Sequence, residues 1–137
     1  MSELVELTPA ECRQHLDRGG VGRLAFLTPR GLRLVPLNYI TNPGVIVFRT
    51  LPASELGTYG DGAEAAFEID EIDPATEQGW SVVAFGRLEG PSETDEVWDI
   101  RGWRNPTPWS GGHRVRQMRL RWDVLTGRRI VHRDAST

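Results

Sequence analysis

The chain has 137 residues, of which 39% are hydrophobic and 26% charged, and its formal net charge is -3. This composition predicts a single globular domain spanning residues 1–137. The overall acidity argues against a nucleic-acid partner, and no apolar run approaches the roughly 20 residues of a membrane-spanning helix. The N-terminus shows no secretory signal, and the lone Cys12 excludes a disulfide framework. We therefore expect a cytoplasmic protein.

The charged residues have two unusual features. All 16 basic residues are arginines, so no lysine can form a Schiff base or act as a general base. Residues 61–99 hold twelve acids and one arginine, whereas residues 113–133 hold seven arginines and one acid. We expect the basic segment to face an acidic strand, within the protein or across a dimer interface.

The first predicted element is a helix after Thr8. Thr8 can cap it, Pro9 suits its first turn, and Glu11 can complete a capping box. Cys12 is expected on its buried face, and the glycines at 19–20 end it.

Three strand-like segments follow, separated by turn residues. They are residues 21–28, 33–40 and 45–50. Pro36 cannot donate a ladder hydrogen bond, so the second segment is expected to be open or bulged there. Such an opening can bring the edge of a ligand to the backbone, or it can simply mark an edge strand.

The next segments are a short helix and two strands. The helix runs to about Tyr59, and Ser54 can cap it. Residues 64–72 alternate between apolar and acidic side chains, which predicts a half-buried strand. Residues 80–88 are apolar on both faces at their centre, as in a barrel wall or an interface strand.

A further helix is predicted from Ser92, followed by a loop over residues 104–112. The last long strand alternates, which places Met118, Leu120, Trp122 and Val124 on one face. Six strands, two helices and one helical turn, without βαβ repetition, predict a mainly β fold of the α+β type. A small antiparallel barrel closed by helices fits this pattern best.

Standard catalytic signatures are absent from the sequence. It has no Gly-x-Ser-x-Gly, Walker, Gly-x-Gly-x-x-Gly or His-Glu-x-x-His motif. The histidines, His15, His113 and His132, have no second ligand at metal spacing, so no metal site is expected.

Two segments carry candidate ligand-binding residues. Arg49 and Thr50 end a strand, and Ser54 begins a helix, which is a donor set that suits a phosphate. A structural ion pair and two helix caps are the alternative. Trp80 and Ser81 open an apolar strand and can line a flat aromatic ligand. A core tryptophan beside a turn is the alternative.

Six short motifs in this order resemble the pyridoxamine 5′-phosphate oxidase-like family of flavin-binding split barrels, and its small bacterial branch in particular. The resemblance covers about residues 7–131. The motifs are Val-Gly-Arg-Leu-Ala-Phe, Val-Pro-Leu-Asn-Tyr, Phe-Arg-Thr, Ala-Phe-Glu-Ile-Asp, Gly-Trp-Ser-Val and Thr-Gly-Arg-Arg-Ile.

The resemblance implies a six-stranded antiparallel split β-barrel of Greek-key type with two to three short helices. It also implies a homodimer with two FMN sites at the subunit interface, and some relatives use a deazaflavin instead. The implied cofactor-binding residues are Val35, Pro36, Asn38, Arg49, Thr50, Ser54, Trp80, Ser81 and Arg128. Trp109, in the proline-rich loop, is a candidate lid over the substrate site.

One position departs from the family pattern. The family commonly has Gly-Ser/Thr-Lys-Leu after Arg-Thr, whereas this chain has Glu55 where the lysine is expected. We expect this acid to weaken phosphate binding. Three interpretations remain: an FMN-dependent oxidoreductase acting on a small substrate, a deazaflavin-dependent reductase, or a non-catalytic barrel that has lost tight cofactor binding.

Overall fold

The computed structural model describes residues 2–91 and 116–132, so the helix predicted from Ser92 and the candidate lid Trp109 lie outside the described residues. None of the described helices is long and apolar enough to cross a membrane. The elements are β1 (Ser2–Glu6), α1 (Pro9–Leu16), β2 (Gly20–Thr28), β3 (Gly31–Asn42), β4 (Val45–Thr50), α2 (Glu55–Tyr59), β5 (Glu64–Asp73), β6 (Gln78–Glu89) and β7 (Arg116–His132).

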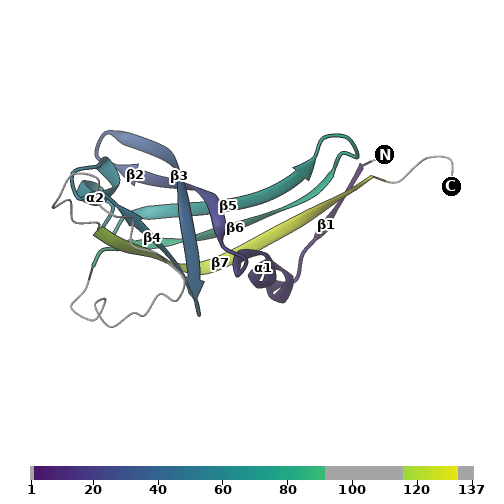
Figure 1. Ribbon diagram of the computed structural model, residues 1–137, viewed down its shortest axis with the longest axis horizontal. Coiled ribbons are helices and arrows are strands. Elements are labelled where there is room, and N and C mark those ends of the chain that lie inside the picture. Colours follow the sequence, from purple (N-terminus) through teal and green to yellow (C-terminus); the bar gives the residue numbers. More distant parts are fainter. Residues whose placement is uncertain (1, 92–115, 133–137) are drawn as a thin grey trace.

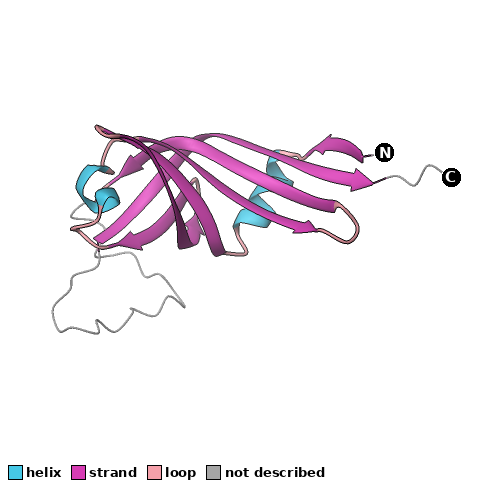
Figure 2. Cartoon of the chain, turned by 90° about the horizontal axis from the view of Figure 1, so that it is seen from above, coloured by secondary structure: helices cyan, strands magenta, loops and turns pink. Residues whose placement is uncertain are grey.

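Strands β2 to β7 form a closed antiparallel ring (Figures 1 and 2). Their order is β7-β4-β3-β2-β5-β6, and β6 pairs again with β7. Because β5 returns beside β2 after three consecutive strands, the connection is a Greek key. The β3–β4 ladder extends only over residues 39–42 and 45–48, which leaves the ring split beside β3. The predicted six-stranded antiparallel split barrel is confirmed.

Strand β1 is a seventh strand that the sequence analysis did not predict. It lies outside the ring and pairs with the C-terminal part of β7, from Glu6 opposite Arg128 to Ser2 opposite His132. Its Leu4 is 62% exposed. A five-residue edge strand that buries no side chain leaves no alternation from which it could be predicted.

Helix α1 confirms its predicted capping signals. Thr8 Oγ1 accepts a hydrogen bond from the Glu11 N–H at 3.2 Å, and Glu11 Oε1 accepts one from the Thr8 N–H at 3.1 Å. Cys12 and Leu16 are fully buried. The helix therefore packs its apolar side against the barrel core, which includes Phe26, Phe48 and Phe67.

A bulge in β7 makes one prediction wrong. Phe85 lies opposite Val124 and Gly86 lies opposite Trp122, so Asp123 is an extra residue in the ladder. The extra residue reverses the alternation of the strand, and Val124 is 49% exposed instead of sharing the buried face of Trp122. The side-chain period of two cannot reveal such an insertion in advance.

The basic segment of β7 faces an acid within the protein, as expected. Arg119 Nε lies 2.7 Å and Arg121 Nε 2.9 Å from the carboxylate of Glu89 on β6. These contacts explain part of the charge asymmetry, since the acidic segment and the basic segment meet along the β6–β7 ladder.

Gly127→Ala is expected to destabilise the fold by about 1–3 kcal/mol, the usual cost of overpacking a core. A Cβ at this position on β7 would lie 2.6 Å from Cys12 Sγ and 3.0 Å from Leu7 Cδ1. In a Cys12→Ala background the loss should shrink, because the clashing sulfur is absent. Urea unfolding measures the free energy that Gly127→Ala costs in the wild-type and Cys12→Ala backgrounds. An equal cost in the two backgrounds would contradict this explanation.

Candidate functional site

A pocket of about 240 Å³ opens at the split of the barrel, between β3 and α2. In the described structure, residues 31–38 of β3 pair with β2 only, so the other edge of the strand offers unpaired backbone groups. Pro36 lies in this open segment, as expected from its missing N–H. The pocket is lined by Phe26, Arg33, Leu34, Val35, Leu37, Thr50, Ser54, Glu55 and Leu56.

Two hydroxyl groups meet at one wall of the pocket. Thr50 Oγ1 lies 2.8 Å from Ser54 Oγ. Ser54 caps α2 as predicted, accepting from the Gly57 N–H at 3.0 Å and donating to the Leu51 carbonyl at 2.7 Å. Because the Ser54 proton is already donated, Thr50 is the donor in the pair, and its hydroxyl is the one that can turn toward a ligand.

An ion pair forms the adjacent wall of the pocket. Arg33 Nε lies 3.1 Å and 3.0 Å from the two carboxylate oxygens of Glu55, and Arg33 Nη1 donates to the Leu32 carbonyl at 3.0 Å. Among the described residues, Arg33 Nη2 has no hydrogen-bond partner. The acid that replaces the family's lysine is therefore neutralised by a neighbouring arginine, which keeps N–H donors at the pocket.

Arg33 is the site residue that the sequence analysis missed. Strand residues two apart share a face, so Arg33 and Val35 both face the pocket. This alternation is the sequence signal from which Arg33 could have been predicted as a pocket residue. The contact with Glu55 was not predictable, because it joins β3 to a helix 22 residues further along the chain.

Three other predicted residues lie outside this pocket. Pro36 and Asn38 are exposed on the opposite face of β3 from Val35. Arg49 occupies the opposite face of β4 from Thr50 by the same alternation, and burial lowers the pKa of its guanidinium.

The remaining predicted residues lie at the other end of the barrel. The Trp80 ring stacks on His15 of α1, with centroids 3.7 Å apart and planes 18° from parallel. Burial, followed by the charge of Arg18, lowers the pKa of His15. Ser81 lies opposite Arg128 in the β6–β7 ladder.

The two groups of predicted residues are far apart within one chain. Thr50 lies opposite Arg116 and Ser81 lies opposite Arg128 on the same strand, β7. Twelve residue steps at about 3.3 Å correspond to roughly 40 Å of strand. Figure 1 shows this separation, with α2 at one end and β1 toward the other. One flavin cannot contact both groups in a single copy.

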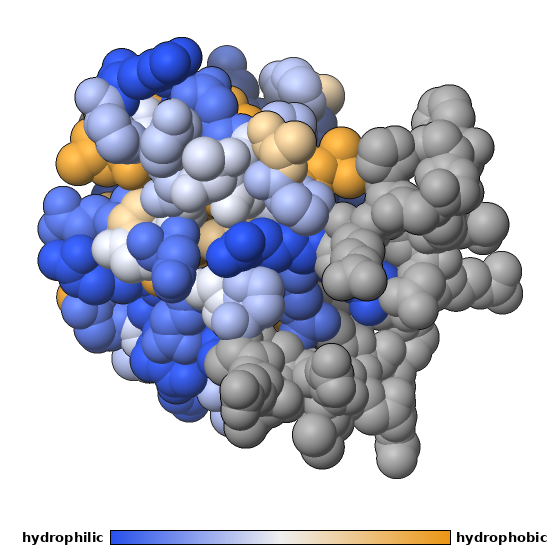
Figure 3. Space-filling model, turned by 90° about the vertical axis from the view of Figure 1, so that its left-hand side faces the viewer, coloured by the Kyte–Doolittle hydropathy of each residue, from blue (hydrophilic) through white to orange (hydrophobic). Residues whose placement is uncertain are grey.

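The end of the barrel that carries α2 has a mainly hydrophilic surface. Figure 3 looks onto this end, where the described apolar side chains form small separate groups. Such a surface suits the polar end of a ligand better than an apolar one.

Comparison with known proteins places the chain in a family. The family model of pyridoxamine 5′-phosphate oxidase matches residues 8–129. An uncharacterized protein of Mycobacterium tuberculosis is 28% identical over 134 residues, which cover 94% of this chain and 87% of that protein.

Solved structures with the same fold agree with this match. The FAD binding protein from Mycobacterium smegmatis is 25% identical, with a TM-score of 0.75 over 91% of this chain and 98% of that one. An FAD-binding protein from Mesorhizobium loti is 19% identical and shares the fold, with a TM-score of 0.72 over 96% of this chain and 100% of that one. Since the family model covers most of its length, this chain belongs to the pyridoxamine 5′-phosphate oxidase family.

Proposed function

We propose that this protein binds a flavin nucleotide, FMN in the first instance, and acts as a flavin-dependent oxidoreductase on a small substrate. The observation that carries the proposal is the pocket at the split of the barrel, where Arg33 and Thr50 lie beside the unpaired edge of β3. A guanidinium with available N–H groups and a hydroxyl suit a phosphate. An unpaired strand edge suits the donors and acceptors of a flavin ring. The residues present therefore fit the cofactor.

The chain's own residues would divide the work of binding. Arg33 would bind the phosphate, Thr50 would orient the adjoining ribityl chain, and the apolar side chains of Phe26 and Leu37 would exclude water from the pocket floor. A bound flavin supplies hydride transfer, while the protein positions it and tunes its surroundings.

The size of the pocket supports a site shared between two copies. Its 240 Å³ lies below the roughly 300–1,000 Å³ of pockets that hold a whole ligand. We infer that the protein is a homodimer in which the pocket of one copy is completed by residues of the other. In such a dimer, Ser81 and Arg128 of one copy could contact the flavin bound beside Thr50 of the other, although they lie far from Thr50 within one copy.

Two alternatives keep the fold and change the function. A deazaflavin can take the place of FMN in the same pocket, and the names of the two FAD-binding structures extend the choice to FAD. A non-catalytic binding module is favoured by one observation, the carboxylate of Glu55 in the pocket wall. Arg33 offsets that charge, so we place the enzyme first.

A titration separates these candidates. Cofactor-stripped protein is titrated with FMN, FAD and a deazaflavin, and binding is followed by flavin fluorescence. We expect micromolar or tighter binding of FMN. Tighter binding of FAD or the deazaflavin would identify that compound as the cofactor and leave the proposed oxidoreductase activity in place. No binding of any of the three would contradict the proposal and favour the non-catalytic binding module.

A further inference from the structure

A second pocket, of about 350 Å³, lies at the end of the barrel remote from α2. In Figures 1 and 2 the β5–β6 hairpin and the C-terminal part of β7 extend past α1 on this side of the molecule. The side chains that give the pocket its chemistry are Glu71, Gln78, Trp80 and Arg129, and we call it the Trp80 pocket. It shares no lining residue with the pocket at the split of the barrel.

Trp80 and Ser81 lie on opposite faces of β6, because neighbouring strand residues point to opposite sides of a sheet. Val82 and Ala84 are buried in the core, and Trp80 has the face of Val82 by this alternation. Ser81 has the face of Phe85, which is exposed on the outside of the barrel. Trp80 therefore belongs to the inner face of the sheet and does not join Ser81 in one site.

The Trp80 ring is held in place by a second ring. His15 of α1 stacks on it with ring centroids 3.7 Å apart. This contact covers one face of the indole, and because Trp80 also lines the pocket, another part of its ring is turned toward the pocket. Such a flat aromatic surface stacks well on planar ligands, nucleobases included.

Two opposite charges lie on either side of the indole. Glu71 on β5 and Arg129 on β7 are both cross-strand partners of Trp80. Cross-strand partners share a face, so the three side chains form one row, whose charged ends are two strand spacings, roughly 10 Å, apart. Within residues 2–91 and 116–132 neither charge has an ion-pair partner. The neighbouring Asp73, by contrast, already accepts the Ala75 N–H at 2.9 Å.

The row of acid, indole and base matches the functional groups of an oxopurine. A carboxylate can accept from N1–H and the N2 amino group on one edge of guanine, and an arginine can donate to O6 and N7 on the adjoining edge. Adenine has an acceptor at N1, which a carboxylate repels. The pocket volume of about 350 Å³ lies within the range of pockets that hold a small ligand.

We propose that the Trp80 pocket binds an oxopurine such as guanine, stacked on the indole, with Glu71 on its N1–N2 edge and Arg129 on its O6–N7 edge. This site is separate from the flavin pocket, and the proposal does not depend on flavin binding.

Isothermal titration calorimetry of the flavin-free protein with guanosine tests the site. Guanosine has no phosphate, so it does not need the cation of the other pocket. We expect a dissociation constant on the order of 0.1 mM or lower, and at least roughly tenfold weaker binding of adenosine. Trp80→Leu and Glu71→Gln should each weaken guanosine binding about tenfold, because they remove the stacking surface and the charged acceptor.

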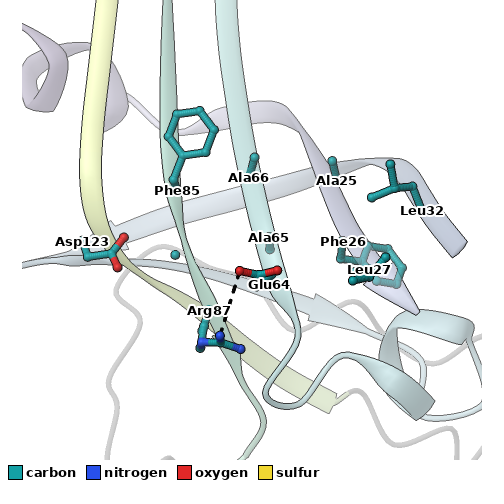
Figure 4. Close-up of a pocket in the computed structure, with 11 residues that line it drawn as sticks. Ala25, Phe26, Leu27, Leu32, Glu64, Ala65, Ala66, Phe85, Arg87 and Asp123 are labelled. Atoms are coloured by element: carbon teal, nitrogen blue, oxygen red, sulfur yellow. Dashed lines mark ion pairs between the residues drawn. The ribbon is translucent and has the colours of Figure 1, made fainter. Parts of the chain in front are cut away.

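The matched controls are Phe85→Leu and Glu64→Gln. They make equivalent changes in a pocket of about 430 Å³ on the outer face of the barrel, where Glu64 lies 4.0 Å from Arg87 (Figure 4). We expect both to bind guanosine like the wild type. Circular dichroism checks that the variants fold, and Glu71→Gln, at an exposed position, carries the test if Trp80→Leu does not.

Three results would overturn the proposal: no guanosine binding at millimolar concentration, equal affinity for adenosine, or wild-type affinity in folded Glu71→Gln. A repeat of the titration with added FMN tests whether the two sites are separate. We expect the same guanosine affinity, whereas a loss of affinity would show that the flavin occupies the Trp80 pocket and would overturn the separate site.

Discussion

Arg33→Ala is expected to weaken FMN binding by about tenfold to a hundredfold and to leave riboflavin binding unchanged. A charge-assisted hydrogen bond contributes about 1.5–3 kcal/mol, and each 1.4 kcal/mol is about a factor of ten in affinity. Riboflavin lacks the phosphate, so it does not need the cation. Fluorescence titrations with the two ligands measure the difference directly.

Arg49→Ala is the matched comparison for this titration. The sequence assigned the phosphate to Arg49, whereas the structure places Arg33, and not Arg49, in the wall of the pocket. Loss of FMN affinity in Arg49→Ala with none in Arg33→Ala would place the phosphate on the other face of β4. That result would contradict the site described above.

The stability of the fold is expected to fall by about 2 kcal/mol between pH 10 and pH 12. Tyr39 is 3% exposed, and its hydroxyl donates to the Leu16 carbonyl at 3.0 Å. Burial, followed by the charge of Asp17, raises the pKa of Tyr39 from 10.0 to about 12. In this range the unfolded chain releases the proton while the folded protein retains it, so rising pH favours unfolding, by about 1.36 kcal/mol per pKa unit.

Tyr39→Phe isolates this contribution. Urea unfolding below pH 10 and near pH 12 should show a much shallower decline for the variant, because phenylalanine does not ionise. At neutral pH the variant should be less stable by about 1 kcal/mol, since the Leu16 carbonyl loses its donor. The same alkaline decline in both proteins would show that Tyr39 is not its cause.

The fold was largely predictable because its signals are local. The capping box of Thr8 and Glu11 and the Ser54 cap each lie within four residues of the groups they bind. The alternation of β5 likewise follows from the period of a strand. The bulge at Asp123 was not predictable, since a single inserted residue is defined only by the partner strand.

The site was predictable only in part because it depends on contacts between distant elements. Val35, Thr50 and Ser54 line one pocket, since the split of the barrel brings β3 close to α2. Arg33 was missed because its role depends on Glu55, and no periodicity links those two residues. Ser81 and Arg128 lie at the other end of β6 and β7, and the sequence of one chain does not indicate that distance.

Hydrogen–deuterium exchange with and without saturating FMN shows whether the opening beside β3 holds a flavin nucleotide. We predict slower exchange in residues 31–38, the open segment of β3, and in residues 50–57, which carry the hydroxyls and Glu55. Unchanged exchange in both segments at saturating FMN would show that the flavin does not bind beside β3.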